Sequence, residues 1–334
     1  MTGTAVPEAA QAALRPPPRV TLGLITYRQE AFVRQALRGA LAQTGSPLEI
    51  IVCDDASPDR TFDEACAEAQ GYRGPHTLRL HRNERNLGIG NFNRLMELAG
   101  GELIIIAHGD DLSQPDRAAR LIEAWRRSGA SMVTSNALGI SEHGERLGYA
   151  LRPGSTPPNR LLDIATKGWN PSLRGAVLAW HREVFDVFGP LDPDRSAVTS
   201  DWILPFRAAA IHGIAYVDAP LVQVRQHPGQ KQRRYILDPT DPLADAESTQ
   251  ASELIQFLYM LDTLAVVRAR ALQTPEVIGA VQAALINAVL RKGQQWRTAR
   301  NRLLASGVRA RWLPADPPAQ APQHGKNSLF DSKL

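Results

Sequence analysis

Residues 102–111 read ELIIIAHGDD, an apolar run followed at once by a histidine, a glycine and two aspartates. The run is short and has no helical periodicity, which predicts a buried strand over residues 102–107. Apolar runs of the same character occur at Val20–Thr26 and Leu48–Cys53, and Asp54-Asp55-Ala56-Ser57 follows the second. Pairs of aspartates therefore follow two strands of one expected sheet.

The segments between these runs have helical patterns. Val33, Leu37 and Leu41 recur every four positions and predict a helix within residues 30–43. Ser57-Pro58-Asp59 predicts the start of the next helix, because serine caps, proline suits the first turn and aspartate favours the positive end of the helix dipole. The same reasoning predicts strands at 78–81 and 131–135, and helices at 89–99 and 115–128. This alternation predicts an α/β fold with a doubly wound, mostly parallel sheet, in which ligands bind at the carboxyl ends of the strands.

The chain divides by pattern into five parts. We expect a disordered lead-in over residues 1–18, a ligand-binding half of the sheet over 19–150, and a second half with mixed short elements over 151–235. A helical C-terminal extension is expected over 236–313, and a flexible, proline-containing tail over 314–334.

Composition narrows the class of protein. The 334 residues carry a net charge of +4, a mild excess that permits phosphate binding without requiring nucleic acid. The two cysteines, Cys53 and Cys66, are too few for a secreted disulfide scaffold. No apolar run reaches the roughly 18 residues that span a bilayer, and the first residues lack the pattern of a secretory signal. We therefore expect a cytoplasmic enzyme.

The two acidic pairs indicate a ligand. Like charges gathered at one edge of a sheet are costly unless a cation or a ligand donor satisfies them. Carboxylates in this position suit a hard divalent cation that carries phosphate oxygens, and Mg²⁺ and Mn²⁺ are the usual choices. The alternative for either pair taken alone is helix capping or loop solubility.

An ordered set of motifs resembles the inverting glycosyltransferases of family 2, which have the GT-A fold, and the resemblance covers residues 19–235. It rests on Val20 to Tyr27, Asp54-Asp55-Ala56-Ser57, Asn86-x-Gly88, Gly101-Glu102-Leu103-Ile104 running into Asp110-Asp111, Gly189, Ser200-Asp201-Trp202, Arg207, Gly213 and Arg225-x-His227. The resemblance implies a nucleoside-diphosphate sugar donor, a divalent metal (Mn²⁺ or Mg²⁺) and direct displacement at the anomeric carbon. The acceptor would be a saccharide or a lipid-linked molecule in bacterial surface polysaccharide or glycoconjugate synthesis.

The resemblance also assigns roles to residues. Asp201 resembles the catalytic base that removes the proton of the acceptor hydroxyl. Asp55 resembles the aspartate that binds the donor's base, and a carboxylate there favours a pyrimidine because it accepts an imide N–H. The donor-binding residues implied are Thr26, Tyr27, Glu30, Asp54, Asp55, Asn86, Gly88, Asn93 and Asp110. The metal-binding residues implied are His108, Asp110, Asp111 and His227.

Some positions depart from the family pattern. His108 occupies the first position of the metal motif, where an aspartate is usual, and it supplies no negative charge. Ile25, Arg28 and Asn93-Arg94 also differ from the residues common in the family. Two other interpretations therefore remain: a non-catalytic nucleotide-sugar-binding protein on the same fold, or an enzyme that synthesises sugar nucleotides, which would need a glycine-rich loop after the first strand.

Three further features have competing interpretations. Gly88-Ile89-Gly90 could cradle a phosphate or form a turn that positions Asn86. Cys53 is expected in the core rather than as a nucleophile. Seven basic residues and no acidic one lie between residues 291 and 311, with tryptophans at 296 and 312. Residues 291–312 are thus either a solvated helix face or a segment that contacts the inner face of an anionic membrane. No nucleic-acid-binding module accompanies them.

Overall fold

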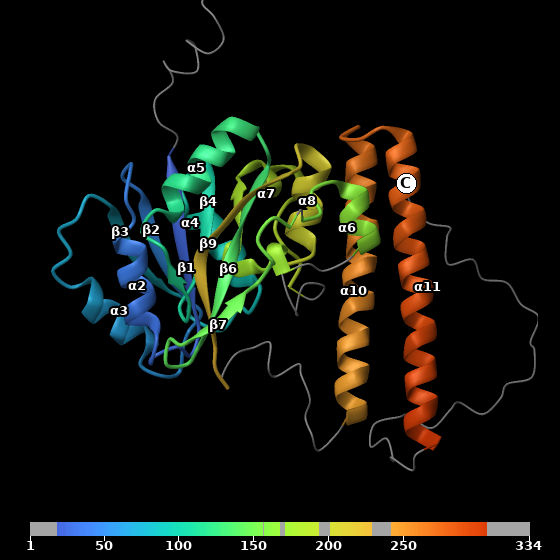
Figure 1. Ribbon diagram of the computed structural model, residues 1–334, viewed down its shortest axis with the longest axis horizontal. Coiled ribbons are helices and arrows are strands. Elements are labelled where there is room, and N and C mark those ends of the chain that lie inside the picture. The colour runs from blue at the N-terminus through green and yellow to red at the C-terminus, as the bar shows by residue number, and fades with distance from the viewer. Residues whose placement is uncertain (1–18, 156, 168–170, 194–200, 229–241, 306–334) are drawn as a thin grey trace, which may run out of the picture.

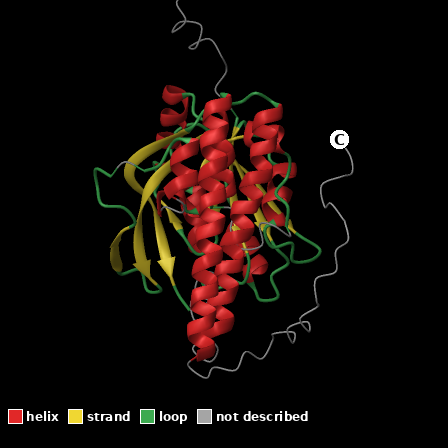
Figure 2. Ribbon diagram, turned by 90° about the vertical axis from the view of Figure 1, so that its right-hand side faces the viewer, coloured by secondary structure: helices red, strands yellow, loops and turns green. Residues whose placement is uncertain are grey.

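The computed structural model describes residues 19–155, 157–167, 171–193, 201–228 and 242–305 (Figure 1). The lead-in predicted over 1–18 and the tail predicted over 314–334 lie outside the described residues. The described part of the chain contains one curled sheet with helices on both faces, and a long helical hairpin packs beside it (Figures 1 and 2).

Among the described residues, nine strands form the sheet in the order β3-β2-β1-β4-β8-β6-β9-β5, and β7 pairs with β6. Their bounds are β1 Val20–Thr26, β2 Glu49–Asp54, β3 Thr77–Arg82, β4 Leu103–His108, β5 Leu112–Ser113, β6 Met132–Ser141, β7 Arg146–Tyr149, β8 Ala179–His181 and β9 Ile214–Gln226. The prediction of an α/β fold with a mostly parallel sheet is confirmed. The predicted strand at residues 20–26 and the observed β1 have the same bounds.

The sheet is not parallel throughout. Strands β3, β2, β1 and β4 are parallel, as are β6 and β9, but β8 runs antiparallel to both β4 and β6. The reason lies in the connection, because β8 follows a short 3-10 turn, η2 (Gly175–Val177), instead of a crossover helix. The chain enters β8 at the carboxyl edge of the sheet and has to run back across it.

Helices cover both faces of the sheet (Figure 1). Helices α2 (Val33–Leu41), α3 (Thr61–Ala69) and α5 (Arg117–Ser128) pack on one face. The other face carries α4 (Gly90–Leu98), α6 (Leu161–Lys167), α7 (Glu183–Phe188), α8 (Ile203–Ile211), α10 (Pro242–Ala269) and α11 (Pro275–Ala305). Alternate residues of one strand supply the two cores, so Ile105 packs on the α2 side and Ile104 on the α4 side.

The hairpin of α10 and α11 shares the second core. Phe257, Met260 and Leu264 of α10 and Val281 and Leu285 of α11 are buried in the same cluster as residues of α4 and α8. Arg207 of α8 donates from Nη2 to the Tyr259 hydroxyl at 2.9 Å and adds a polar link. Among the described helices, none combines the length and apolar character needed to cross a bilayer.

The helix predicted to begin at Ser57-Pro58-Asp59 begins instead at Thr61. The Ser57 hydroxyl does not cap it, because that hydroxyl donates to Asp54 Oδ1 at 2.6 Å. Asp59 instead accepts both the Thr61 N–H and the Thr61 hydroxyl. A helix does start close to the predicted capping residues, but the Ser57 hydroxyl stabilises the loop after β2 instead of capping that helix.

Candidate active site

The carboxyl edge of the parallel strands gathers the loops predicted to form the site. The Asp55 N–H donates to Thr26 O at 2.9 Å, which joins the ends of β1 and β2. The Gly109 N–H donates to Ile25 O at 3.0 Å, which joins the ends of β1 and β4. A Cβ atom on Gly109 would lie 2.8 Å from Thr26 Cγ2, so the two loops touch and Gly109 has no room for a side chain.

Asp54 is completely buried and ties two strand ends together. Its Oδ1 accepts the Thr26 hydroxyl at 2.9 Å and the Ser57 hydroxyl at 2.6 Å, while its Oδ2 accepts the Ser57 N–H at 2.9 Å. Arg82 lies 3.7 Å from Oδ2. The structure therefore places Asp54 as a support of the loop, with its carboxylate engaged by protein donors.

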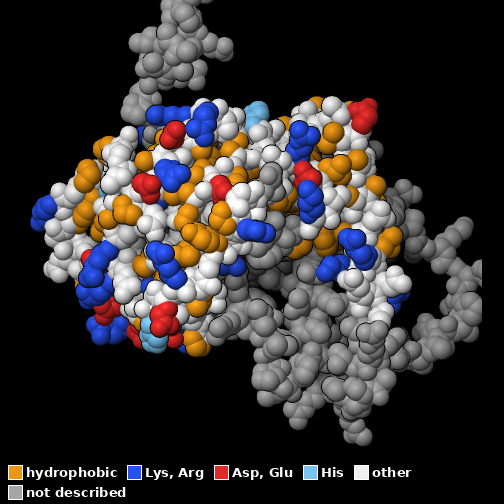
Figure 3. All heavy atoms as spheres, in the orientation of Figure 1, with side chains coloured by type: hydrophobic (Ala, Val, Ile, Leu, Met, Phe, Trp, Pro, Cys, Tyr) orange, Lys and Arg blue, Asp and Glu red, His pale blue; other side chains and the backbone are white. Residues whose placement is uncertain are grey.

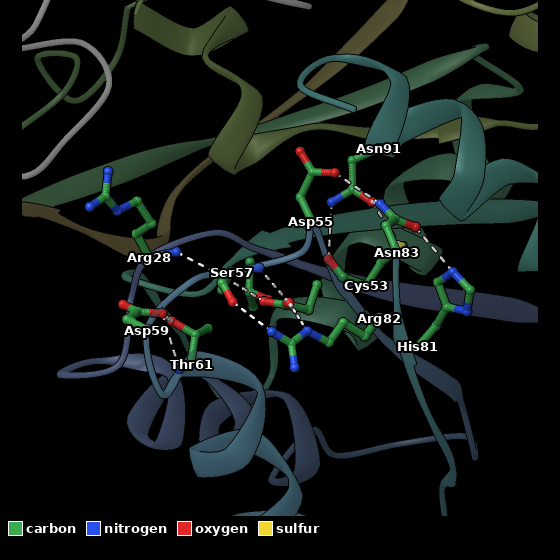
Figure 4. Close-up of polar contacts among 12 residues, drawn as sticks. Arg28, Cys53, Asp55, Ser57, Asp59, Thr61, His81, Arg82, Asn83 and Asn91 are labelled. Carbon is green, nitrogen blue, oxygen red and sulfur yellow. Dashed lines mark hydrogen bonds and ion pairs between the residues drawn. The ribbon is translucent and has the colours of Figure 1, made fainter. Parts of the chain in front are cut away.

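Asp55 is also buried, and its carboxylate lies toward Asn83 and Asn91 (Figure 4). Oδ1 accepts the Leu87 N–H at 2.8 Å and Asn83 Nδ2 at 2.9 Å, and Oδ2 accepts the Gly88 N–H at 2.8 Å. Asn83 in turn donates to Asn91 Oδ1, which fixes the amide network behind the loop (Figure 4). The turn at Gly88 thus gives its N–H to Asp55, and a phosphate cradle at Gly88-Ile89-Gly90 stays a prediction.

The remaining residues predicted to bind the donor surround this loop. Tyr27 is 39% exposed at the end of β1, where its ring is open to a ligand. Glu30 accepts the Arg60 N–H at 2.9 Å, and Asn86 accepts the Gly88 N–H at 3.0 Å. Asn93 exchanges two hydrogen bonds of 2.8 Å with the backbone of Leu191, so its amide joins α4 to the segment after α7.

Backbone strain occurs at the same edge. Only three non-glycine residues among those described have a left-handed φ, and two of them, Arg28 and Ala56, lie in the loops after β1 and β2. Such conformations cost of order 1–3 kcal/mol each and concentrate at functional sites. Their position beside Asp54 and Asp55 supports the interpretation of this edge as a binding site.

A second group of acidic and imidazole side chains lies at the end of β4. His108, Asp110 and Asp111 each offer one ligand atom, and these atoms lie within 4.8 Å of one another. His227, which follows β9, donates from Nε2 to Asp110 Oδ2 at 3.1 Å. One imidazole nitrogen and two carboxylates form a donor set that suits Mn²⁺ or Mg²⁺, so these residues fit a divalent cation.

The electrostatics of this group agree with that fit. Burial lowers the pKa of His108, so its ring is neutral and keeps a lone pair for a metal. Burial raises the pKa of Asp111 well above its usual range, and the charge of Asp110 adds to the effect. Burial also acts to raise the pKa of Asp110, but the hydrogen bond from His227 and the two neighbouring imidazoles lower it overall. A bound cation would stabilise both carboxylates as anions.

Arg225 holds the loop that carries the two aspartates. Its N–H donates to Asp111 Oδ1 at 2.9 Å, and its Nε donates to Asp110 O at 3.0 Å. The guanidinium lies 4.9 Å from the centre of the Phe32 ring, and it also donates to Gln35 Oε1 at 2.9 Å. The sequence showed Arg225 only as part of a motif with His227, because its partners are distant in the chain.

Asp201 lies two residues before the start of α8 and is 7% exposed. Its Oδ1 accepts the Gly175 N–H at 2.9 Å. A Cβ atom on Gly175 would lie 2.9 Å from that oxygen and 3.4 Å from His108 Cε1. The space beside the Gly175 backbone therefore lies between Asp201 and His108, which places Asp201 close to the group around His108. Sequence analysis did not identify Gly175, because a single glycine in an irregular segment carries no signal of its own.

A mixed sheet of this order, with carboxylates and imidazoles at its carboxyl edge, agrees with the GT-A fold. The sequence model of glycosyl transferase family 2 matches residues 21–189 of this chain. The chain therefore belongs to that family. The resemblance found in the sequence is thus confirmed for the family and the fold.

Curated relatives agree with this assignment. The chain is 24% identical over 213 residues to an uncharacterized glycosyltransferase of Nostoc sp. and 25% identical over 227 residues to the putative glycosyltransferase EpsH of Bacillus subtilis. The matches cover 63% and 65% of this chain, and 65% and 64% of those proteins, so the chain spans less than two thirds of their length. A match to the succinoglycan biosynthesis protein ExoO of Rhizobium meliloti is 33% identical and covers 39% of this chain and 36% of ExoO.

Solved structures support the fold alone. The mannosyltransferase PcManGT from Pyrobaculum calidifontis, solved with GDP-Man and Mn²⁺, superposes with a TM-score of 0.51 at 18% identity. The superposition covers 89% of this chain and 86% of that one. TarS from S. aureus, solved with UDP, also gives a TM-score of 0.51, at 14% identity over 89% of this chain and 94% of that one.

Proposed function

We propose that this chain transfers a sugar from a nucleoside-diphosphate sugar to an acceptor hydroxyl with inversion, in the synthesis of a bacterial surface polysaccharide or glycoconjugate. The observation that carries the proposal is the position of Asp201 beside the His108 group, where Gly175 donates to Asp201 and a Cβ atom on Gly175 would touch both residues. An inverting displacement needs a base on one side of the anomeric carbon and a stabilised leaving group on the other.

The residues have separate roles in this proposal. Asp201 accepts the proton of the attacking hydroxyl, and its hydrogen bond from the Gly175 N–H fixes its direction. His108, Asp110 and Asp111 would hold Mn²⁺ or Mg²⁺, with His227 closing over Asp110. When bound, the metal supplies charge stabilisation for the leaving diphosphate.

Asp55 is proposed to select the base. Each carboxylate oxygen can accept two hydrogen bonds, and Oδ2 of Asp55 receives the Gly88 N–H from the described residues. It can therefore accept the imide N–H of uracil or thymine, while the exposed Tyr27 ring packs on the base. We propose that residues 19–150 bind the donor, that 151–235 shape the acceptor side, and that 236–313 cover or anchor it.

The test compares wild-type protein with an Asp201→Asn variant. Nucleoside diphosphates and nucleotide sugars are screened by thermal shift with and without Mn²⁺, and we expect UDP or dTDP to stabilise the protein more than ADP or GDP. Hydrolysis of the selected donor with Mn²⁺ is then measured. We expect Asp201→Asn to bind donor normally and to react at least about 100-fold more slowly, since a general base contributes about 10²–10⁴-fold.

Two further variants complete the design. Asp110→Ala should remove Mn²⁺-dependent binding of the nucleoside diphosphate, and equal affinity in wild type and variant by calorimetry would refute the metal assignment. A wild-type protein that binds donors but hydrolyses none would favour the non-catalytic interpretation. Near-normal turnover of Asp201→Asn would return Asp201 to a capping role before α8.

We also propose that α11 contacts an anionic membrane. No acidic residue lies between positions 277 and 315, while seven basic residues do. Leu290 is 64% exposed, and Arg291 and Arg297 are exposed near it. Figure 3 shows basic side chains among apolar ones on this part of the hairpin, and Figure 1 shows α11 ending on the side of the carboxyl edge. This location would bring a lipid-linked acceptor to the site of a cytoplasmic enzyme.

Vesicle sedimentation tests this contact. Each basic residue near an anionic surface contributes about 1 kcal/mol, so Arg291→Glu with Lys292→Glu should weaken binding to phosphatidylglycerol vesicles at least about 10-fold. The matched control reverses Arg126 and Arg127, exposed on α5, and should bind as wild type does. Equal sedimentation of wild type with purely zwitterionic vesicles would contradict the proposal.

A further inference from the structure

The turn η2 lies between the two halves of the proposed reaction site. Gly175 begins this turn, and its N–H donates to Asp201 Oδ1 at 2.9 Å. A Cβ atom there would point between Asp201 Oδ1, at 2.9 Å, and His108 Cε1, at 3.4 Å. Contacts under 3.0 Å are essentially never seen for real Cβ atoms, so a side chain at Gly175 would force a shift. The missing side chain therefore sets how closely Asp201 approaches His108.

The backbone of Gly175 does not need glycine for its own conformation. Its φ is outside the left-handed region occupied by nine other glycines among the described residues, such as Gly88 and Gly189. An alanine at this position would thus be compatible with the local backbone. The constraint on Gly175 comes from the space between Asp201 and His108.

The turn is fixed against β4 from two sides. The Ile106 N–H donates to Leu178 O at 3.1 Å. Arg117 of α5 donates from Nη2 to Ile106 O at 2.6 Å and to Ala176 O at 2.8 Å, and from Nη1 to Ser113 Oγ at 2.9 Å. One guanidinium therefore joins the strand that ends in His108 to the turn that begins at Gly175.

Arg117 is completely buried yet carries a charge. Burial lowers its pKa to about 10, opposed by the negative charge of Asp111, so the guanidinium stays protonated at neutral pH. A buried charge is costly unless it is hydrogen-bonded, and Nη2 of Arg117 donates to two backbone carbonyls while Nη1 donates to Ser113. Its buried Nε has no hydrogen-bond partner among the described residues. Burying this charge therefore costs free energy, and the turn that it stabilises is the one that contacts Asp201.

We propose that Gly175 and Arg117 are positioning residues for the transfer reaction: Arg117 fixes the turn, and Gly175 sets the separation between Asp201 and His108. This inference rests on the proposed role of Asp201. Because the turn is held on both sides, a methyl group on Gly175 is accommodated by a shift of the Asp201 carboxylate.

The size of the effect follows from the contact. Restoring an ordinary van der Waals separation of 3.4 Å from a contact of 2.9 Å requires a shift of about half an ångström. A misplacement of about 1 Å in a catalytic group can cost about 10²-fold in rate. We therefore expect Gly175→Ala to lower donor turnover about 10- to 100-fold. The affinity for UDP with Mn²⁺ should stay within about twofold, because the base and phosphate contacts lie elsewhere.

The experiment measures turnover and nucleotide affinity separately for wild type, Gly175→Ala, Arg117→Lys and Gly279→Ala. UDP is the probe, or GDP if the nucleotide screen selects it, and the substrate is the sugar nucleotide that wild type hydrolyses fastest. Gly279 in α11 is the matched control, since a Cβ atom there meets nothing within 4 Å, and its alanine variant should behave as wild type. Arg117→Lys keeps the charge but lacks the planar guanidinium that donates from Nη1 to Ser113 and from Nη2 to the two carbonyls. It should therefore also lower turnover more than it lowers UDP affinity.

The outcomes separate the hypotheses. Turnover of Gly175→Ala within twofold of wild type, or an equal loss of UDP affinity and turnover, would overturn the inference. Crystal structures of wild type and Gly175→Ala give a readout that does not depend on catalysis, and an unchanged separation of Asp201 Oδ1 from His108 would also overturn it. Wild-type protein that hydrolyses no donor would instead refute the proposed function, and the crystal structures would still decide the geometry.

Discussion

Replacing Asp55 by asparagine should destabilise the loop that carries the donor-binding residues. The carboxylate receives three hydrogen bonds of 2.8–2.9 Å, from the Leu87 N–H, the Gly88 N–H and Asn83 Nδ2. Asparagine keeps one acceptor oxygen and replaces the other by an NH₂ group. In either orientation of the amide, this NH₂ group faces a donor on the loop.

The magnitude follows from the bonds that are lost. A buried donor left without its partner costs about 1–3 kcal/mol, and the remaining bonds lose the strength that an ionised acceptor gives them. Gly88 itself is exposed, so water partly compensates its N–H. We therefore expect Asp55→Asn to lower stability by about 1–3 kcal/mol, which corresponds to a fall in Tm of several degrees.

Thermal unfolding followed by circular dichroism, without nucleotide, measures this effect. The matched control is Asn86→Ala, which removes an exposed acceptor of the same Gly88 N–H and should change stability by less than about 0.5 kcal/mol. Added UDP should recover less stability in Asp55→Asn than in wild type. An Asp55→Asn protein that melts with wild type would show that the carboxylate does not hold the loop.

Three further predictions concern the scaffold. Native protein at pH 8 should react with a thiol reagent at exposed Cys66 and not at Cys53. Burial and the nearby charge of Asp55 raise the pKa of Cys53 to about 12. Two reacted thiols per native chain would contradict this prediction. Gly101→Ala should lower Tm, because a Cβ atom there would lie 2.5 Å from Thr21 N. Gly100→Ala should leave Tm unchanged, because a Cβ atom there would only touch Glu49 at 3.6 Å. Equal Tm values for the two variants would refute this packing. Arg207→Met should lower Tm, because it removes the hydrogen bond to the Tyr259 hydroxyl that joins α8 to α10. Tyr259→Phe should reproduce part of this loss. An unchanged Tm in both variants would contradict a stabilising role for this hydrogen bond.

The parts of the structure that the sequence predicts well are those with local signals. Strand β1 and the ends of β2 and β4 follow from short apolar runs, and the polar residues after them had to meet at one edge once the strands were parallel. The start of α3 was misplaced by a few residues, because Ser57 has two uses for its hydroxyl and only the folded loop selects one. The antiparallel direction of β8 has no local signal at all.

The supports of the site were missed for a different reason. Arg225 contacts Gln35, which is 190 residues away in the chain, and Arg117 contacts Ala176, which is 59 residues away. No periodicity or spacing marks such pairs. Asp55, Asp110 and His227 were found because they follow strands, and Asp201 was found through the family resemblance. The groups that orient these side chains depend on long-range packing.

The hairpin of α10 and α11 shares a core with α4 and α8, so this protein cannot be cut between them without exposing apolar surface. The family match ends at residue 189, yet Phe257, Met260, Leu264 and Val281 complete the core against α4 and α8. A chain cut at the family boundary would expose this apolar surface, and aggregation is the expected fate of such a fragment. The stretch that the family match covers is therefore smaller than the unit that folds, and an exchange of segments should move the hairpin together with the helices it covers.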